Sequence, residues 1–391
     1  MPRKSLEVAL EPRTLIWARE SMGMNVQDMA KRLKVNQSTV SAWESGQKKP
    51  TLVQAERLAH VLKRPLAVLF LPEPPKTLPL PKDYRTVPMD ERNPFSSETF
   101  LAVRRARRLQ SLAIDLAREL GREIGPQVGM ARPSEDAEEA AAKARQQLGI
   151  EVQRQFAWRN ANEALKEWRK ALEQGRVLVF QQAMPLKETR GFSLTDAEIP
   201  VIVLNARDSL NGRIFSLFHE YAHLLLDDSG ICGGEETDNF PGHVGVIERF
   251  CNHFSGALLV PKAPLLDHEL VRSTRGIVPW SESSLTELAA SFKVSREVIL
   301  RRLVLFGRAS AAFYKRKREE WKAQTEKRQE QRRTGGISPA MRCIRDSGTP
   351  FAALVLEAHR QGTITYSDVA DYLAIRVKHL PQIEQLIRDT S

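Results

Sequence analysis

Two histidines and a glutamate stand together in an apolar stretch of this sequence. The segment FSLFHEYAHLLL, residues 215–226, places His219 and His223 four positions apart, with Glu220 directly after the first histidine. On a helix, residues four apart lie on one face, so both imidazoles can reach one metal ion with Glu220 beside it. Phenylalanine and leucine flank the motif, so its helix must be largely buried, where imidazoles without partners are costly. The spacing therefore predicts a zinc ion at this helix, one per chain.

A third ligand must come from elsewhere, because catalytic zinc sites keep three protein ligands and an open position for water. The downstream candidates are Asp227, Asp228, Cys232, Glu235, Glu236, His243, Glu248, Cys251 and His253. Asp227 and Asp228 follow the motif by less than two turns and are poorly placed. Glu248 lies on the next amphipathic segment, and a carboxylate from a second helix would leave the fourth corner open. The pattern alone does not choose among them, and Cys232 is also a candidate fourth ligand that keeps the site latent.

Short apolar runs and helical stretches must position this motif. RVLVFQQ (176–182) and IPVIVLN (199–205) are rich in valine or isoleucine and bounded by polar residues, as strands are. A helical run begins at about 211, and apolar spacing predicts helices over about 97–124 and 135–174. The fold class that follows is mainly α with a small β-sheet (α+β).

The N-terminal segment has the punctuation of two short helices joined by a tight turn. Asn25 can cap one helix running to about Leu33, and Asn36 can cap a second running to about Glu44. Met29, Ala30, Leu33, Val40 and Trp43 supply the inward faces. Short polar side chains on the outward face can read base edges in a major groove, and two lysines follow as phosphate contacts. The predicted DNA-binding residues are Gln27, Gln37, Ser38, Thr39, Ser41, Lys48 and Lys49.

Composition and punctuation give the organisation of the chain. Prolines crowd between Pro72 and Pro88, which indicates a semi-rigid connector. The predicted parts are a DNA-binding domain (1–75), a connector (76–98), a helical segment (99–175), a core that contains the histidine motif (176–310), and a charged helix with a helical extension (311–391). With 391 residues, a formal charge of +11, three cysteines and no apolar run that could span a bilayer, the expectation is a cytoplasmic protein without disulfides or membrane contact.

Residues 12–71 resemble the XRE (Cro/C1-type) helix-turn-helix family. The matching stretches are Met29 to Leu33, Val40 to Gly46, Pro50, and Leu58 with Ala59. The resemblance implies an all-α domain whose second helix enters the groove and in which Glu44 is structural. It also implies binding to double-stranded operator DNA as a dimer.

Residues from about 176 to 305 resemble the ImmA/IrrE family of zinc metallopeptidases. The carrying residues are 201–205, 213–215, 219–223, Glu248, Asn252, Phe254 and 258–261, followed by 288–303. The resemblance implies a zincin-like fold in which His219, His223 and Glu248 hold zinc and Glu220 is the general base. Tyr221 and His243 are candidate donors to the oxyanion. Cys251 and His253 depart from the family pattern and could perturb the site or sense oxidants.

Two other segments have a functional and a structural interpretation. Residues 288–303 mimic a second helix-turn-helix, but we expect them to complete the core of the peptidase domain. The run 315–333 could touch the DNA backbone, but a solvated helix with intrahelical ion pairs is the favoured interpretation.

Two functions follow from the sequence. In the first, a DNA-binding regulator carries a zinc endopeptidase that cleaves a repressor or another cognate regulator in a stress, prophage or mobile-element switch. In the second, a non-proteolytic repressor or antitoxin uses the peptidase-like domain as a sensor or to bind a toxin or another co-encoded partner. The intact set of His219, Glu220, His223 and Glu248 favours the first, because a pure binding module has no use for a base.

Overall fold

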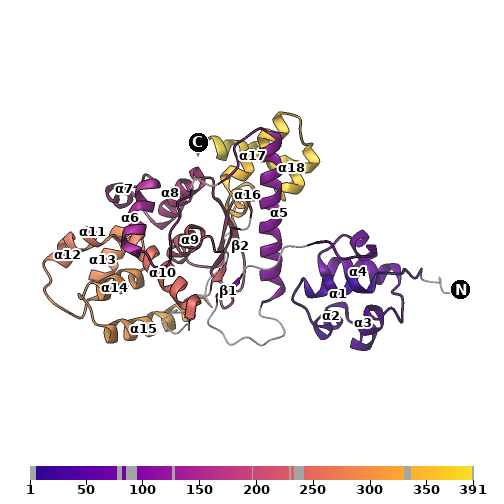
Figure 1. Cartoon of the computed structure of the whole chain (residues 1–391), viewed down its shortest axis with the longest axis horizontal. Coiled ribbons are helices and arrows are strands. Elements are labelled where there is room, and N and C mark those ends of the chain that lie inside the picture. The colour runs from indigo at the N-terminus through magenta and orange to yellow at the C-terminus, as the bar shows by residue number, and fades with distance from the viewer. Residues whose placement is uncertain are drawn as a thin grey trace. The chain divides into compact units, whose positions relative to one another are not determined.

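The computed structural model describes residues 6–76, 82–84, 95–125, 128–195, 197–228, 230–232, 242–329 and 336–389. The chain divides into two compact units (Figure 1). Unit 1 comprises residues 1–80 and 87–105, and unit 2 comprises residues 81–86 and 106–391. Most of the expected connector, residues 77–81 and 85–94, lies outside the described residues, as do Glu235, Glu236 and Gly335. No described helix is long and apolar enough to cross a membrane.

Unit 1 is a small bundle of helices. It contains α1 (Pro12–Glu20), α2 (Val26–Leu33), α3 (Gln37–Glu44), α4 (Leu52–Leu62), the short 3-10 helix η1 (Leu66–Phe70) and the start of α5 (Ser97–Glu119). Asn25 caps α2 as predicted, because its side chain accepts a hydrogen bond from Asp28 N. Asn36 precedes α3, but its side chain makes no capping bond. The predicted inward faces of α2 and α3 are buried together with Leu15 and Leu58.

A buried ion pair ties α1 to α3. Arg19 Nε lies 2.6 Å from Glu44 Oε1, and the exposed fractions of the two side chains are 11% and 9%. Arg19 also donates to Met24 O, at the turn before α2. Because a buried charge without its partner is strongly destabilising, Glu44 has the structural role that was expected for it.

Unit 2 is built on a five-stranded mixed sheet with the strand order β1-β5-β3-β4-β2. The strands are β1 (Lys82–Tyr84), β2 (Leu178–Gln182), β3 (Gly191–Leu194), β4 (Val201–Asn205) and β5 (Gly230–Cys232). β2 pairs with β4 in parallel, Leu178 opposite Val201, and β3 runs antiparallel to both β4 and β5. The two predicted strands are confirmed, and the other three were not predicted.

Helices cover the sheet and build the core of unit 2. The stretch 135–174, for which a helical pattern was predicted, is helical and consists of α6 (Ala137–Gln147), α7 (Val152–Ala157) and α8 (Ala161–Gln174). The first break falls at Gly149, whose φ of 63° ends α6, and Asn160 caps α8 through its side chain. α9 (Leu210–Leu225) contacts β3 and β4 on one side and α8 and α10 (Gly242–Leu259) on others.

The following helices complete this core. They are α11 (Lys262–Asp267), α12 (Glu269–Arg272), α13 (Glu282–Phe292), α14 (Arg296–Leu305) and α15 (Ala311–Gln329). α13 and α14, which mimic a second helix-turn-helix, bury Leu288, Phe292, Ile299 and Leu303, in agreement with a core role. α15 is only partly the solvated helix that was expected. It carries the ion pair Lys317–Glu320, but Phe313, Tyr314 and Trp321 pack into the core.

The C-terminal extension packs against the outer strand β2. It consists of α16 (Pro339–Ser347), α17 (Thr349–Arg360), α18 (Tyr366–Tyr372), the 3-10 helix η3 (Val377–His379) and α19 (Leu380–Arg388). α16 lies along β2 (Figure 1), where Gln182 Nε2 donates to Asp346 O at 3.3 Å. Arg169 on α8 donates both to Arg345 O and to Val179 O, which fastens the extension to the sheet.

Candidate metal centre

Helix α9 presents the three motif residues from a buried position. It begins after Ser209, whose side chain accepts a hydrogen bond from Gly212 N, and one side of it consists of Ile214, Leu217, Phe218 and Ala222 in the core. His219, Glu220 and His223 are 6%, 1% and 0% exposed. The sequence therefore places charged and titratable side chains where the rest of the helix is apolar, a cost that a bound partner would offset.

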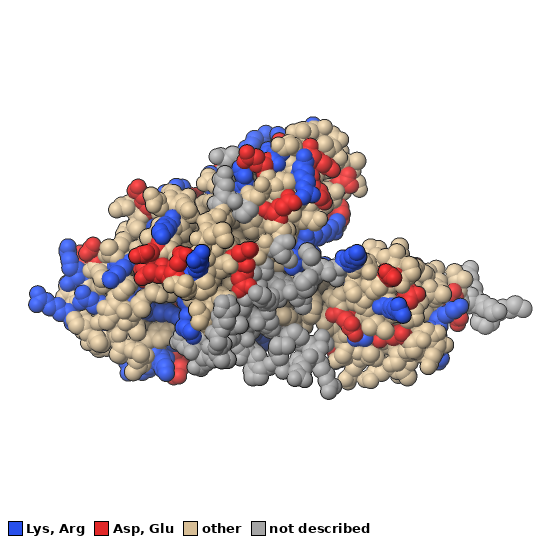
Figure 2. All heavy atoms as spheres, in the orientation of Figure 1, with Lys and Arg blue, Asp and Glu red and all other residues tan. Residues whose placement is uncertain are grey.

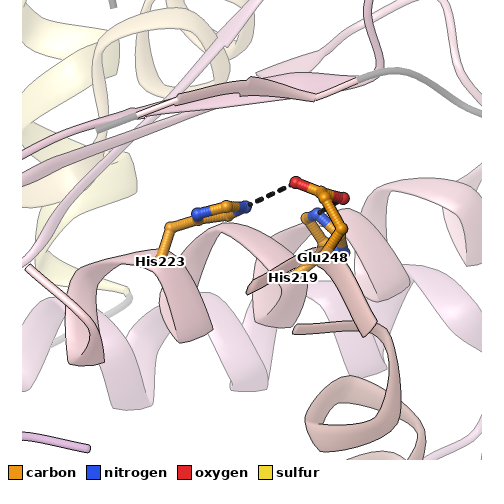
Figure 3. Close-up of side chains that lie close together, drawn as sticks. All are labelled: His219, His223 and Glu248. Atoms are coloured by element: carbon orange, nitrogen blue, oxygen red, sulfur yellow. Dashed lines mark ion pairs between the residues drawn. The ribbon is translucent and has the colours of Figure 1, made fainter. Parts of the chain in front are cut away.

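Glu248 on α10 meets both histidines. Its Oε2 lies 3.3 Å from His219 Nε2, and its Oε1 lies 3.2 Å from His223 Nε2. In Figure 3 the two imidazoles rise from one face of α9, and the Glu248 carboxylate lies beside them. One ligand atom from each of the three residues falls within 4.8 Å of the others. Among the candidates for a third ligand whose side chains are described, the structure brings Glu248 to the histidines.

Charge and burial act against each other on these groups. Burial raises the pKa of Glu248, but the adjacent His219 and His223 outweigh it and hold the pKa well below its usual range. For His219, burial lowers the pKa, but the carboxylates of Glu248 and Glu220 outweigh it, so the pKa is raised above 6.5. Two buried carboxylates, those of Glu248 and Glu220, thus act on the imidazoles, and this arrangement favours a cation between the imidazoles and Glu248.

The donor set fits a zinc ion. Two imidazole nitrogens and one carboxylate are a ligand set that zinc takes in hydrolytic sites. His219 Nδ1 lies 3.2 Å from Asn252 Oδ1, and this contact keeps Nε2 turned toward Glu248. Metal-binding histidines commonly hold their other nitrogen in this way, which fixes the tautomer and the ring orientation. The residues present would thus provide both the ligands and the support that such an ion needs.

The other candidate ligands lie elsewhere or cannot be placed. His253 Nε2 is 2.8 Å from Glu138 Oε1, and Asp227 is exposed. Cys251 is fully buried, and burial first, then the nearby carboxylates, raise the pKa of its thiol well above its ordinary value. Because the thiolate is the reactive form, this environment speaks against Cys251 as an oxidant sensor. The side chains of Cys232 and His243 lie outside the described part of the chain.

Metal binding should be steeply pH-dependent. A metal must displace the proton of His219, whose pKa is raised, so we expect apparent zinc affinity to fall as the pH drops through that value, by about tenfold per pH unit. In the protein without metal, the effect of pH on stability has the opposite sign. The stability that His219 gains from its pairing with Glu248 is present at low pH and is lost as the pH rises through the raised pKa. Competition with a chelator between about pH 5.5 and about pH 8.5 measures the effect, and a flat profile would contradict it.

Two family models match the chain. Residues 172–304 match the IrrE N-terminal-like domain, a peptidase family, and residues 15–69 match the helix-turn-helix family. The chain joins a helix-turn-helix domain to an IrrE-like peptidase domain. The helix-turn-helix match contains α2 and α3. The IrrE-like match contains His219, Glu220, His223 and Glu248. A comparison with curated proteins found no match.

The helix-turn-helix domain exposes most of the predicted DNA contacts. Gln37, Ser38 and Ser41 lie on the solvent side of α3, Gln27 is exposed on α2, and Thr39 is half-buried. Lys48 and Lys49 are exposed in the loop after α3. On the face that Figure 2 shows, basic and acidic side chains are interspersed, so the argument for DNA rests on these helices rather than on bulk charge.

Several residues of the IrrE-like domain have roles that the sequence did not reveal. Asn252 is one of the residues that carry the family resemblance, but its contact with His219 depends on how α10 packs against α9. Asn205 is fully buried and hydrogen-bonds four backbone atoms around the end of β4. Tyr221 lies in the core against Phe218 and Phe254, and burial raises its pKa to about 12, so it acts as a packing residue.

Proposed function

We propose that this DNA-binding regulator carries a zinc-dependent endopeptidase that cleaves a regulatory protein of the repressor type. The observation that carries the proposal is the meeting of His219, His223 and Glu248 with Glu220 buried beside them. A binding module would need the ligands but not the additional carboxylate, whereas hydrolysis needs a base near the ion.

The roles of the residues follow from their positions. His219, His223 and Glu248 would hold the ion, which when bound supplies Lewis acidity toward a peptide carbonyl and toward water. Asn252 orients His219 through Nδ1. Glu220 takes the proton of the attacking water and returns it to the leaving amine, so peptide hydrolysis is balanced without any other co-reactant. The buried surroundings keep bulk water from screening these charges.

Target choice would come from the helix-turn-helix domain and from the substrate protein. We propose that α3 enters the major groove of an operator and that two chains bind paired half-sites. The natural substrate is then a repressor, this chain itself, or another cognate regulator found near the same DNA. A toxin or other co-encoded protein is a further candidate partner.

The test is incubation of zinc-loaded protein with purified candidate repressors and with itself, followed by mass spectrometry of the products. A new fragment with a free amino terminus, formed by wild type and absent with chelator, supports the endopeptidase. If substrates that bind tightly stay intact in the presence of zinc, the peptidase proposal fails, and the sensor or antitoxin function takes its place.

DNA binding has its own test. We expect Lys48→Ala and Lys49→Ala each to weaken binding to all DNA sequences and to reduce the slope of log affinity against log salt by about 1, because each removes one phosphate contact. Gln37→Ala should instead reduce the preference for the operator over other DNA, since it faces the base edges. Lys378→Ala, an exposed lysine far along the chain, is the matched control. Fluorescence anisotropy across salt concentrations measures both effects, and equal losses for Lys378→Ala would contradict the assignment.

A further inference from the structure

We propose that Gly191 is a positioning residue for Glu220: the missing side chain at this point of β3 is the space in which the carboxylate of the base is held. This inference rests on the proposed function and assigns it a residue that touches neither metal nor substrate. It also assigns Thr189 and Asn205 the task of fixing the backbone at Gly191.

Gly191 of β3 faces the side chain of Glu220, the proposed general base. A Cβ placed on Gly191 would lie 3.2 Å from Glu220 Oε1 and 3.3 Å from Glu220 Cγ, and 2.9 Å from Val203 O on the neighbouring strand. Carbon atoms of real side chains rarely come so near to such neighbours, so an alanine there must displace something. The flexible group among these neighbours is the Glu220 side chain. Val203 O, the closest of the three atoms, belongs to the backbone of β4, so part of the strain from an alanine would remain whatever residue stands at position 220. The carboxylate therefore lies against the position that a side chain at residue 191 would occupy.

The backbone conformation of Gly191 does not by itself require a glycine. Gly191 does not adopt a left-handed backbone conformation, since it is absent from the residues with positive φ. It pairs within the sheet with Leu204 of β4 and Cys232 of β5. Gly191 is the first residue of β3 and is paired on both sides, and a glycine within a sheet commonly marks a site where another group approaches closely. Here the approaching group is the carboxylate of Glu220.

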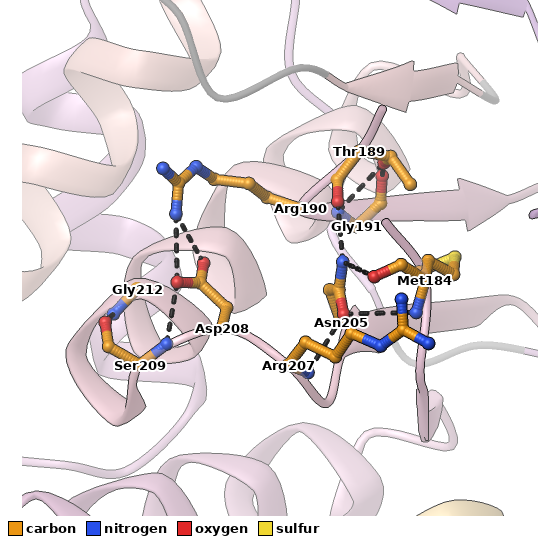
Figure 4. A network of polar contacts seen from close by, with 9 residues as sticks. All are labelled: Met184, Thr189, Arg190, Gly191, Asn205, Arg207, Asp208, Ser209 and Gly212. Atoms are coloured by element: carbon orange, nitrogen blue, oxygen red, sulfur yellow. Dashed lines mark hydrogen bonds and ion pairs between the residues drawn. The ribbon is translucent and has the colours of Figure 1, made fainter. Parts of the chain in front are cut away.

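Hydrogen bonds from buried neighbours hold the backbone of Gly191 in place. The hydroxyl of Thr189 donates to Gly191 O at 2.6 Å and accepts from Gly191 N at 3.2 Å. Thr189 O in turn accepts from Asn205 Nδ2 at 2.8 Å, as Figure 4 shows. Thr189 and Asn205 are both fully buried. Hydrogen bonds thus run from Asn205 at the end of β4 through Thr189 to Gly191, whose missing side chain would meet the base.

The mechanical consequence concerns geometry rather than charge. A general base must lie within hydrogen-bond reach of its proton, and a displacement of about 1 Å can reduce the rate about 100-fold. Because Gly191 bounds the carboxylate from the sheet side, a side chain there would push Glu220 away from that position. The three heavy atoms nearest to an added Cβ belong to Glu220 and Val203 and to none of the three candidate ligands, so metal binding should persist.

The first experiment needs no enzymatic activity. Thermal unfolding is measured for wild type, Gly191→Ala, Glu220→Ala and the double variant, all without metal. Gly191→Ala should lower Tm by about 5 °C in wild type and by clearly less in the Glu220→Ala background, where the carboxylate is gone. Equal losses in the two backgrounds would show that the glycine does not serve Glu220, and the proposal would be overturned. Gly336→Ala, whose Cβ would meet no atom within 4 Å, is the matched control.

The second experiment uses cleavage and zinc binding. Gly191→Ala should bind zinc as wild type does, by equilibrium dialysis, and should lose about 100-fold in kcat with KM unchanged. In a Glu220→Asp background, whose shorter carboxylate withdraws from β3, the further loss should fall below about threefold. A loss of zinc, or equal kcat losses in both backgrounds, would overturn the proposal. If wild type cleaves nothing, the proposed function fails, and the thermal comparison alone decides the role of Gly191.

Discussion

Glu220→Gln should abolish peptide cleavage while leaving zinc bound. Glutamine is nearly the same size, so the packing around this 1% exposed side chain should persist, but its amide cannot accept the proton of the attacking water. Loss of a general base typically lowers rates by about 10² to about 10⁴, and a thousandfold loss in kcat/KM corresponds to about 4 kcal/mol of transition-state stabilisation. Zinc content by elemental analysis, beside fragment formation by mass spectrometry, measures both halves of the prediction.

The control for this substitution is Glu384→Gln, which changes an exposed glutamate on α19 in the same way. It should retain both zinc and cleavage. Cleavage by zinc-loaded Glu220→Gln at wild-type rates would remove Glu220 from the mechanism. Loss of zinc from the same variant would mean instead that Glu220 supports the ligands, and the division of roles on α9 would have to be redrawn.

Asn205→Ala should strongly destabilise the peptidase-like domain. The amide donates to Met184 O and Thr189 O and accepts from Met184 N and Arg207 N. Alanine would leave these buried backbone groups without that partner, and each such group costs about 1 to about 3 kcal/mol. We expect a loss of about 3 kcal/mol in the free energy of unfolding, which denaturant titration followed by circular dichroism measures.

Asn162→Ala is the comparison for Asn205→Ala, because Asn162 is exposed near the start of α8. Its free energy of unfolding should stay within about 0.5 kcal/mol of wild type. Equal stability of Asn205→Ala and wild type would show that the loop between β2 and β3 is held by other contacts. The argument for Asn205 as the anchor of Thr189 would then fail.

The main elements of the site could be predicted because their signals are local. The apolar runs that became β2 and β4, and the helix of His219 and His223, are recognisable from residues that follow one another. β3 could not be predicted in this way. GFSL is four residues long, begins with glycine, and becomes a strand because β4 and β5 pair with it. Pairing across the chain decides such a segment, and no local pattern contains that information.

The site itself was predictable to the same limit. The spacing of His219 and His223 corresponds to about one turn of helix, so it can be recognised from the sequence alone. The position of Glu248 depends on how α10 crosses α9, and the sequence reached it only through a family resemblance. Asn252, Asn205 and Gly191 act through contacts between elements distant in the chain. In the sequence alone, nothing about Gly191 indicates that a carboxylate lies beside it.

The packing of α16 against β2 has a consequence for the order in which the protein can mature. The strands of the sheet lie between Lys82 and Cys232 in the sequence. The helix that covers the β2 edge, α16, begins only at Pro339. A ribosome must therefore release the chain as far as α16 before this edge is sheltered, and until then an uncovered strand is a site for chain-to-chain association. The helix-turn-helix domain lies wholly in the first part of the chain and can fold early. A nascent chain would thus gain its DNA-reading part well before its peptidase sheet is complete.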